Sequence, residues 1–444
     1  MTETTNADLI DLLAGILPGD TLAGIRDQRA QARENAQRSF AALLEPAEPG
    51  SFPLSERYAI ALFVAQLHRF TAAEAFYADV LGDEAPELVA VIRGLSEQAA
   101  SHGPVGAYRE PGLYGESVLA LPWEPDTVAV GALGQRLAAA FTHAHLLVFR
   151  PREATPAALA ALVDAGWSAD DVVSLSQLVS FLSFQLRAAW GLRALGRVGS
   201  GAPNGRGATA PVAHTAPPVQ TSRGVGAPLS ARSEELITSY PELNRPHAFT
   251  QESLGWVPWL SPVPESDLTA EQREALIDPQ RAKMPYFRLL ARDPQALHAR
   301  TLTDLDIFFN VTDGIGRAER ELAATAASRH NGCVFCASVH SAAATRESAG
   351  GDGTDRGDAV QRLLDDGVGA DLGHPVWNAV VRASVSLTNT PLAFGEPDVA
   401  ALRAVGLGDD EIVDVISGAA FFNWANRLML SLGEPEVPVR KARA

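Results

Sequence analysis

Hydrophobic and polar residues recur along most of this chain with the period of an α-helix. Residues 317–329 are rich in strong helix formers, and His330-Asn331-Gly332 after them is typical of a helix end. A second helical pattern covers residues 334–344. Residues 140–149 suggest a strand, but they fit a helix end followed by a loop equally well. The pattern therefore predicts an all-α protein.

Part of this helical pattern occurs twice. Residues 166–187 align without gaps on residues 406–427, and each segment has the pattern of a capped amphipathic helix. Further towards the N-terminus, Glu56-Arg57 matches Glu319-Arg320. The repeat predicts two similar helical domains in tandem.

A shift in composition separates the two copies. From residue 196 to about residue 230, Gly, Pro, Ser and Thr crowd the sequence and hydrophobic periodicity is lost, which is typical of a flexible linker. We therefore predict an N-terminal domain over residues 1–195, a flexible linker over 196–235 and a C-terminal domain over 236–444. A length of 444 residues agrees with two to three domains.

Charge and composition limit the possible function classes. The net charge is −17, with 53 acidic against 36 basic residues, which argues against nucleic acid or an anionic membrane as a partner. The N-terminus has no basic region followed by an apolar run, and no uninterrupted apolar stretch is long enough to span a bilayer. We expect a cytoplasmic protein with no membrane partner, in a compartment where thiols stay reduced.

The chain contains two cysteines, Cys333 and Cys336, and they form a CxxC pair. A structural zinc site generally needs four Cys or His ligands, so His340 and Glu321 would have to complete the set. A structural disulfide closing so short a loop removes little entropy from the unfolded chain. Two neighbouring thiols, one of them activated, are instead the minimum that reversible thiol–disulfide redox chemistry requires.

The predicted helices bring an acid and a base towards this pair. The CxxC lies in the first turn of the second helix, where the helix dipole favours a thiolate. His340, one turn beyond Cys336 on the same face, can take a thiol proton, and Glu321 on the preceding helix can orient the imidazole. The helix-end argument alone favours Cys333 as the thiolate. We expect Cys336, because His340 gives it a specific proton acceptor.

The spacing Glu321-x11-Cys333-x2-Cys336-x3-His340 resembles the active-site pattern of alkylhydroperoxidase D and of the wider carboxymuconolactone decarboxylase-like superfamily. Residues 259–264 and 419–427 resemble its peroxidase-related branch, so the resemblance covers roughly residues 248 to 434. It implies that Cys336 is the peroxidatic thiol and that Cys333 resolves its sulfenic acid as a disulfide. Glu321 and His340 would form the proton relay.

The resemblance also implies what the protein works with. The substrate would be an organic hydroperoxide, and an external dithiol or a lipoyl-type reductant protein would supply electrons. No cofactor and no metal are expected, and the superfamily implies a homo-oligomer. Phe335 stands where some relatives have a second histidine, which implies a simpler relay or a weaker peroxidase.

The repeat predicts that the N-terminal half lacks this chemistry. It would be a carboxymuconolactone decarboxylase-like helical domain without the redox motif, fused to the alkylhydroperoxidase D-like catalytic domain. Its task would be to bury a face of the active half or to complete an oligomer interface. The residues aligned with Glu321, Cys333, Cys336 and His340 are Tyr58, Phe70, Ala73 and Tyr77 respectively.

Three alternatives remain open at the level of the sequence. The CxxC pair could serve as a thiol–disulfide reductant for a peroxiredoxin. It could also bind zinc or record oxidation in a non-enzymatic structural protein.

The role of three polar residues in segment 406–427 is also open. Asn423, Asn426 and Arg427 share a helix face, where they either line the pocket or form a polar network that holds helix ends.

Overall fold

The computed structural model describes residues 8–200, 231–350 and 356–438. These residues form helices and one small two-stranded sheet, which confirms the predicted all-α class. Before the linker, the α-helices are α1 (Leu9–Ala14), α2 (Thr21–Arg26), α3 (Ala30–Leu44), α4 (Leu54–His68), α5 (Thr71–Glu84), α6 (Pro86–Gln98), α7 (Thr127–Leu133), α8 (Gln135–Phe149), α9 (Pro156–Asp164) and α10 (Ala169–Ser200).

The C-terminal half adds a second series of helices and the sheet. Its α-helices are α11 (Ala231–Leu236), α12 (Ala270–Ala275), α13 (Pro285–Leu290), α14 (Pro294–Phe309), α15 (Arg317–Asn331), α16 (Val334–Gly350), α17 (Gly357–Asp365), α18 (Pro375–Thr388), α19 (Glu396–Ala404) and α20 (Asp409–Leu432). Strand β1 (Gly255–Pro258) pairs antiparallel with β2 (Gly433–Glu436). Short 3-10 helices are η1 (Asp27–Arg29), η2 (Pro111–Glu116), η3 (Pro151–Glu153), η4 (Glu265–Asp267) and η5 (Pro279–Lys283).

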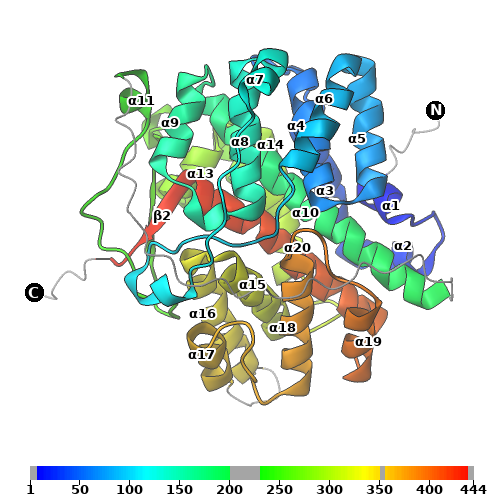
Figure 1. Cartoon of the computed structure of the whole chain (residues 1–444). Helices are drawn as coiled ribbons and strands as arrows, with labels where there is room; N and C mark the ends of the chain where they lie inside the picture. Colours follow the sequence, from blue (N-terminus) through cyan, green and yellow to red (C-terminus); the bar gives the residue numbers. More distant parts are fainter. Residues whose placement is uncertain (1–7, 201–230, 351–355, 439–444) are drawn as a thin grey trace, which may run out of the picture.

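Helices α10 and α20 pack against each other in the middle of the molecule (Figure 1). Helices α4 to α9 lie on one side of this pair and α15 to α18 on the other (Figure 1). Phe181 and Phe184 of α10 pack on Trp424 of α20, with ring centroids 5.1 and 5.6 Å apart. Helix α3 packs on α14 in a second contact between the halves. One continuous hydrophobic core therefore contains residues from both halves.

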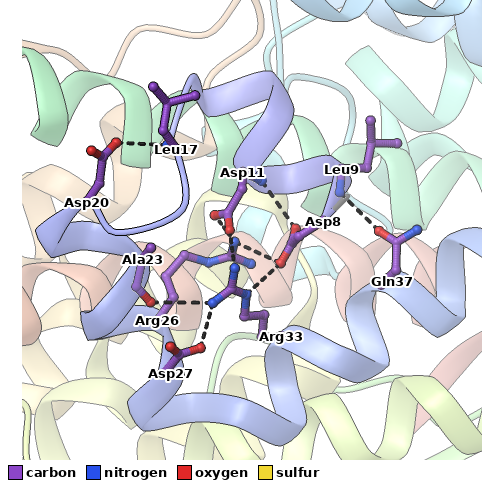
Figure 2. Close-up of polar contacts among 10 residues, drawn as sticks. All are labelled: Asp8, Leu9, Asp11, Leu17, Asp20, Ala23, Arg26, Asp27, Arg33 and Gln37. Carbon is purple, nitrogen blue, oxygen red and sulfur yellow. Dashed lines mark hydrogen bonds and ion pairs between the residues drawn. The ribbon is translucent and has the colours of Figure 1, made fainter. Parts of the chain in front are cut away.

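An ionic cluster fastens the first helices to one another. Arg26 and Arg33 lie between the carboxylates of Asp8 and Asp11, with 3.0 Å from Arg26 Nη1 to Asp8 Oδ2 and 2.9 Å from Arg33 Nε to the same oxygen (Figure 2). Nearby, Arg29 Nη2 lies 2.9 Å from Oδ2 of Asp414 in α20. The contact of Arg29 with Asp414 holds the N-terminal segment against the C-terminal half.

The sequence repeat is visible in where the helices begin and end. Helices α10 and α20 start at Ala169 and Asp409, which are aligned residues. Helices α4 and α15 also end at aligned positions, and each is followed by a residue in the left-handed conformation, Arg69 with φ of 57° and Gly332 with φ of 81°. The aligned segments therefore form matching helices with matching ends.

Two aligned arginines make reciprocal bonds between the halves. Arg187 of α10 donates from Nη2 to the carbonyl oxygen of Thr388 at 2.9 Å. Arg427 of α20 donates from Nη2 to the carbonyl oxygen of Val148 at 3.2 Å. Both arginines are fully buried. Each half thus satisfies a carbonyl near the end of a helix in the other half.

Helical structure enters both ends of the predicted linker. Helix α10 continues to Ser200, because extending an existing helix costs little even through weak helix formers. Helix α11 covers Ala231–Leu236, and the rest of the linker prediction, residues 201–230, lies outside the described residues. Residues 140–149, which also fitted a strand, belong to helix α8 up to Phe149.

Helix α10 is also long and apolar enough, over Ala169–Val198, to cross a membrane by length and composition. However, 94% of its most apolar window is buried inside the protein. The core helix of a soluble fold passes the same test, so this is weak evidence for a membrane span.

Candidate active site

The turn between α15 and α16 positions the CxxC pair. Helix α15 ends at Asn331, and Gly332 then adopts φ of 81°, a conformation that suits glycine. A Cβ at this position would also lie 2.7 Å from Nε of Arg152. The chain passes directly into α16, so Cys333 stands just before the helix and Cys336 in its first turn.

The two cysteines form a reduced, buried pair. Their sulfur atoms lie 3.1 Å apart, and the Cys333 thiol donates to the Cys336 sulfur. Cys333 is 1% exposed and Cys336 is 5% exposed. A disulfide has sulfurs about 2 Å apart, so a small movement is enough to join them.

An imidazole–carboxylate pair accompanies the thiols. Nδ1 of His340 lies 2.6 Å from Oε2 of Glu321. With its proton on Nδ1, the imidazole donates to the carboxylate and keeps Nε2 to accept a proton. Arg317 donates from Nε to Oε1 of Glu321 at 3.3 Å, and the rings of Phe308 and Phe422 pack on the imidazole at 5.8 and 4.1 Å. The orientation of the imidazole is therefore fixed from several sides.

The electrostatic environment differs between the two thiols. Burial raises the pKa of Cys333 well above its usual value, and the neighbouring Cys336 raises it further. Burial acts in the same direction on Cys336, but the hydrogen bond from Cys333 and the charge of His340 outweigh it, so the pKa of Cys336 is lowered. Burial also disfavours a charged His340, yet its contact with Glu321 raises the imidazole pKa. These surroundings favour the thiolate on the second cysteine.

A buried amide network links α15 to α20. Asn331 donates from Nδ2 to Oδ1 of Asn423 at 3.2 Å and to Oδ1 of Asn426 at 2.9 Å. Asn426 donates to Oγ of Ser328 at 3.0 Å. A hydrogen bond from Asn426 also contributes to the lowered pKa of Cys336. The α20 amides therefore form a network that holds helices together, and Asn426 connects that network to the dithiol.

Helix α14 contributes residues that the sequence analysis missed. Arg300, Asp304 and Phe308 are each one turn apart and lie along one face of the helix. Phe308 packs on His340, and the charge of Arg300 helps to lower the pKa of Cys336. Burial raises the pKa of Asp304, against the charges of Arg300 and His340. The spacing of these residues just upstream of the motif is the signal that could have found them.

The N-terminal half forms part of the wall beside Cys333. A small pocket there is lined by Arg109, Glu110 and Arg152 from that half, together with Trp256 of β1. Arg152 is buried and Arg109 is half-buried, and burial, which disfavours their charge, lowers the pKa of both. The N-terminal half therefore closes one side of the dithiol site.

The aligned position in the N-terminal half is filled by apolar and aromatic side chains. Tyr58, Phe70, Ala73 and Tyr77 are all buried. The hydroxyl of Tyr77 donates to Oε1 of Gln185, a contact between two core side chains. This half therefore offers no thiol, imidazole or carboxylate at the four aligned positions.

Metal ligands do not gather anywhere in the part of the chain that the structure describes. No group of three or more His, Cys, Asp or Glu side chains there could hold a metal ion. His143 and His145 lie on α8, where burial lowers the pKa of each to about 4. The zinc alternative therefore gains no support from the described residues.

Comparison with known proteins matches one segment of the chain to a protein family. Residues 294–352 match the model of the carboxymuconolactone decarboxylase family. This segment spans helices α14 to α16 and contains both cysteines, Glu321 and His340. Comparison with curated proteins and with solved structures found no match. The family match supports a relationship to the superfamily that includes decarboxylases and alkylhydroperoxidase D-like peroxidases.

Proposed function

We propose that this protein is a thiol-dependent peroxidase that reduces organic hydroperoxides through the dithiol of Cys333 and Cys336. The observation that carries the proposal is the 3.1 Å contact between the sulfurs, with a lowered pKa on the thiol next to the imidazole–carboxylate pair. Peroxide reduction needs a thiolate that attacks oxygen and a second thiol within reach of the product. Cys336 and Cys333 would fill these two roles.

The oxidative half of the cycle begins at Cys336. His340 takes the thiol proton, and the sulfur attacks the terminal oxygen of the hydroperoxide ROOH. The S–O bond forms as the O–O bond breaks, and the electron pair leaves on RO⁻, which accepts the proton from His340 to give ROH. Cys336 becomes a sulfenic acid. The Cys333 thiol then attacks its sulfur, forming the disulfide and releasing water.

An external dithiol completes the cycle. It donates two electrons and two protons to the disulfide and is itself oxidised to a disulfide. A lipoyl group on a protein belongs to this chemical class. Since the thiol with the lower pKa is the better leaving group, we expect attack at the Cys333 sulfur with release of the Cys336 thiolate.

The N-terminal half acts in this proposal as a second, redox-inactive copy of the fold. Three observations support this role: the matching helix ends, the reciprocal bonds of Arg187 and Arg427, and the apolar residues at the aligned site. Its contribution would be to bury one face of the active half and to form the wall beside Cys333.

The proposal is tested with cumene hydroperoxide and a dithiol donor, comparing the wild type with Cys336→Ser and Cys333→Ser. Cys336→Ser should abolish peroxide reduction. Cys333→Ser should complete one turnover and leave a sulfenic acid that dimedone traps. Because the chain has no other cysteine, loss of thiols reports on this pair alone. The reverse pattern would assign the attack to Cys333.

The same protein preparations separate the alternatives. Disulfide exchange with a peroxiredoxin but no reaction with cumene hydroperoxide would indicate a thiol–disulfide reductant. Stoichiometric zinc, without loss of thiols on peroxide treatment, would indicate a structural or sensory role. Release of carbon dioxide from a carboxymuconolactone by both cysteine variants would indicate the decarboxylase chemistry that also occurs in the matched family.

A further inference from the structure

Arg300 is a buried cation whose charge acts on the carboxylate of Asp304, one turn along α14. It is 5% exposed, and its Nε has no hydrogen-bond partner in the described part of the chain. No carboxylate among the described residues forms an ion pair with it. Instead, its guanidinium carbon lies 5.2 Å from the ring centroid of Phe421 and 5.9 Å from those of Tyr286 and Trp424. The charge is enclosed by aromatic rings.

Tyr286 adds a second unsatisfied polar group to this enclosure. The residue is 8% exposed, and its hydroxyl has no hydrogen-bond partner within the described ranges. Burial raises its pKa to about 12, so the hydroxyl keeps its proton and can donate. The Nε–H group of Arg300 and the hydroxyl of Tyr286, both donors, thus lie near one another without a hydrogen-bond acceptor among the described residues.

This enclosure adjoins the dithiol on two sides. Tyr286 packs edge-on against Trp256 at 5.4 Å, and Trp256 lines the same pocket as Cys333. Towards the other end, Arg300 precedes Phe308 by two turns of α14, and Phe308 packs on His340. Arg300 and Tyr286 therefore lie between the wall beside Cys333 and the wall beside the imidazole.

A buried guanidinium with an unsatisfied donor is costly to the fold. The cation–π contacts and the neighbouring carboxylate of Asp304 offset part of the cost of removing the charge from water. Apolar side chains of similar volume would fill the same space at lower free energy. Unsatisfied donors beside a reactive sulfur are therefore expected where a ligand completes them.

We propose that Arg300 and Tyr286 hold the two oxygens of the hydroperoxide and stabilise the alkoxide that leaves when Cys336 attacks. This inference rests on the proposed peroxidase function. In the attack, negative charge moves from sulfur to the oxygen that carries the organic group as the O–O bond breaks. A fixed guanidinium is already oriented to receive that charge. The aromatic rings around it would accommodate an alkyl or aryl group, so the substrate class is an apolar organic hydroperoxide rather than hydrogen peroxide.

The test uses Arg300→Met and Tyr286→Phe in single-turnover oxidation of Cys336 by cumene hydroperoxide. Arg300→Met should lower the rate constant about 100-fold or more, the usual effect of removing one oxyanion donor. Tyr286→Phe should lower it roughly tenfold, the equivalent of one neutral hydrogen bond. Arg300→Lys keeps the charge and should recover part of the loss.

Alkylation by iodoacetamide is the second readout, because that reagent reports on the thiolate but has no peroxide oxygens. The factor by which Arg300→Met lowers the alkylation rate should be at least ten times smaller than the factor by which it lowers the peroxide rate. If both rates fall by the same factor, Arg300 acts on the thiolate alone and the subsite does not exist. If neither rate changes, the inference is also wrong. A wild type that reacts with cumene hydroperoxide no faster than free cysteine would instead refute the proposed function itself.

Thermal stability separates a binding role from a structural one. Arg300→Met and Tyr286→Phe each remove a donor that has no partner, so the melting temperature should stay the same or rise. Arg427→Met is the matched control, since Arg427 is equally buried but donates to Asn423 and Val148. It should melt lower. A comparable fall for Arg300→Met would show that Arg300 supports the fold and would overturn the proposal.

Discussion

Glu321→Gln tests how the thiolate is stabilised with the least change to the structure. The glutamine has the same shape, so its amide oxygen can still accept from Nδ1 of His340, but the negative charge is gone. The His340 and Glu321 side chains are 18% and 3% exposed, so solvent screens their interaction only weakly. Because Glu321 raises the pKa of His340, its loss should leave less imidazolium. Since His340 in turn lowers the pKa of Cys336, the thiolate should become scarcer at neutral pH.

The size of the effect follows from the 2.6 Å contact between Nδ1 and Oε2. A hydrogen bond to a charged group contributes about 1.5–3 kcal/mol. At 1.36 kcal/mol for each factor of ten, this corresponds to roughly a 10- to 100-fold loss of reactivity at Cys336. The loss should shrink as the pH rises, because at high pH the thiol ionises without help.

The assay is the pH dependence of the rate at which iodoacetamide alkylates Cys336, measured in Cys333→Ser so that one thiol reacts. Glu347→Gln is the matched control. Glu347 pairs with Arg317 at 3.7 Å, as Glu321 does at 3.3 Å, but Glu347 makes no contact with the imidazole among those described. Glu347→Gln should match the parent variant. If Glu321→Gln stays within twofold of the parent across neutral pH, the relay from carboxylate to imidazole to thiolate is wrong.

Three further predictions concern stability. Gly332→Ala should destabilise the protein by at least about 1–2 kcal/mol in urea unfolding, because a Cβ is strained at φ of 81° and would lie 2.7 Å from Nε of Arg152; an unchanged midpoint would contradict the conformation of the turn. Arg427→Met should lower the free energy of unfolding by about 2–4 kcal/mol, because it leaves the carbonyl of Val148 buried without its partner. A urea midpoint within 0.5 M of wild type, which corresponds to about 1 kcal/mol, would show that this hydrogen bond contributes little to stability. Burial lowers the pKa of His330 from 6.5 to about 4, so the unfolded state takes up this proton first. Relative to His330→Gln, the wild type should therefore lose stability as the pH falls from 6.5 towards 4, and a pH-independent difference would mean that His330 is not buried in its neutral form.

Much of the site could be predicted because it is local in sequence. Helix periodicity, the stop at Gly332 and the one-turn spacing from Cys336 to His340 place Glu321, Cys336 and His340 on two consecutive helices. The structure has both helices. The spacing also anticipated that Glu321 orients the imidazole, and the two groups are in contact. Short-range patterns of this kind need no knowledge of tertiary packing.

The parts that the sequence did not reveal come from distant segments. Arg300 lies outside the motif; its spacing from Asp304 and Phe308 is visible in the sequence, but only packing shows that its Nε has no hydrogen-bond partner among the described residues. The wall formed by Arg109 and Arg152 depends on how the N-terminal half docks, and nothing in local periodicity specifies that. The repeat led us to expect that the N-terminal half buries a face of the active half or completes an oligomer interface, but the continuous core could not be predicted, because a linker composition indicates where a chain can bend but not how closely the flanking parts pack.

The two halves depend on each other more closely than a tandem repeat requires. Arg187 and Arg427 are fully buried, and each donates to a carbonyl near the end of a helix in the other half. Separating the halves would leave two buried cations and two helix-end carbonyls without these partners, which is costly in a low-dielectric interior. The N-terminal half is therefore part of what keeps α20 in place, and α20 carries the amide that reaches Cys336. The dithiol site thus rests on packing that the N-terminal half provides.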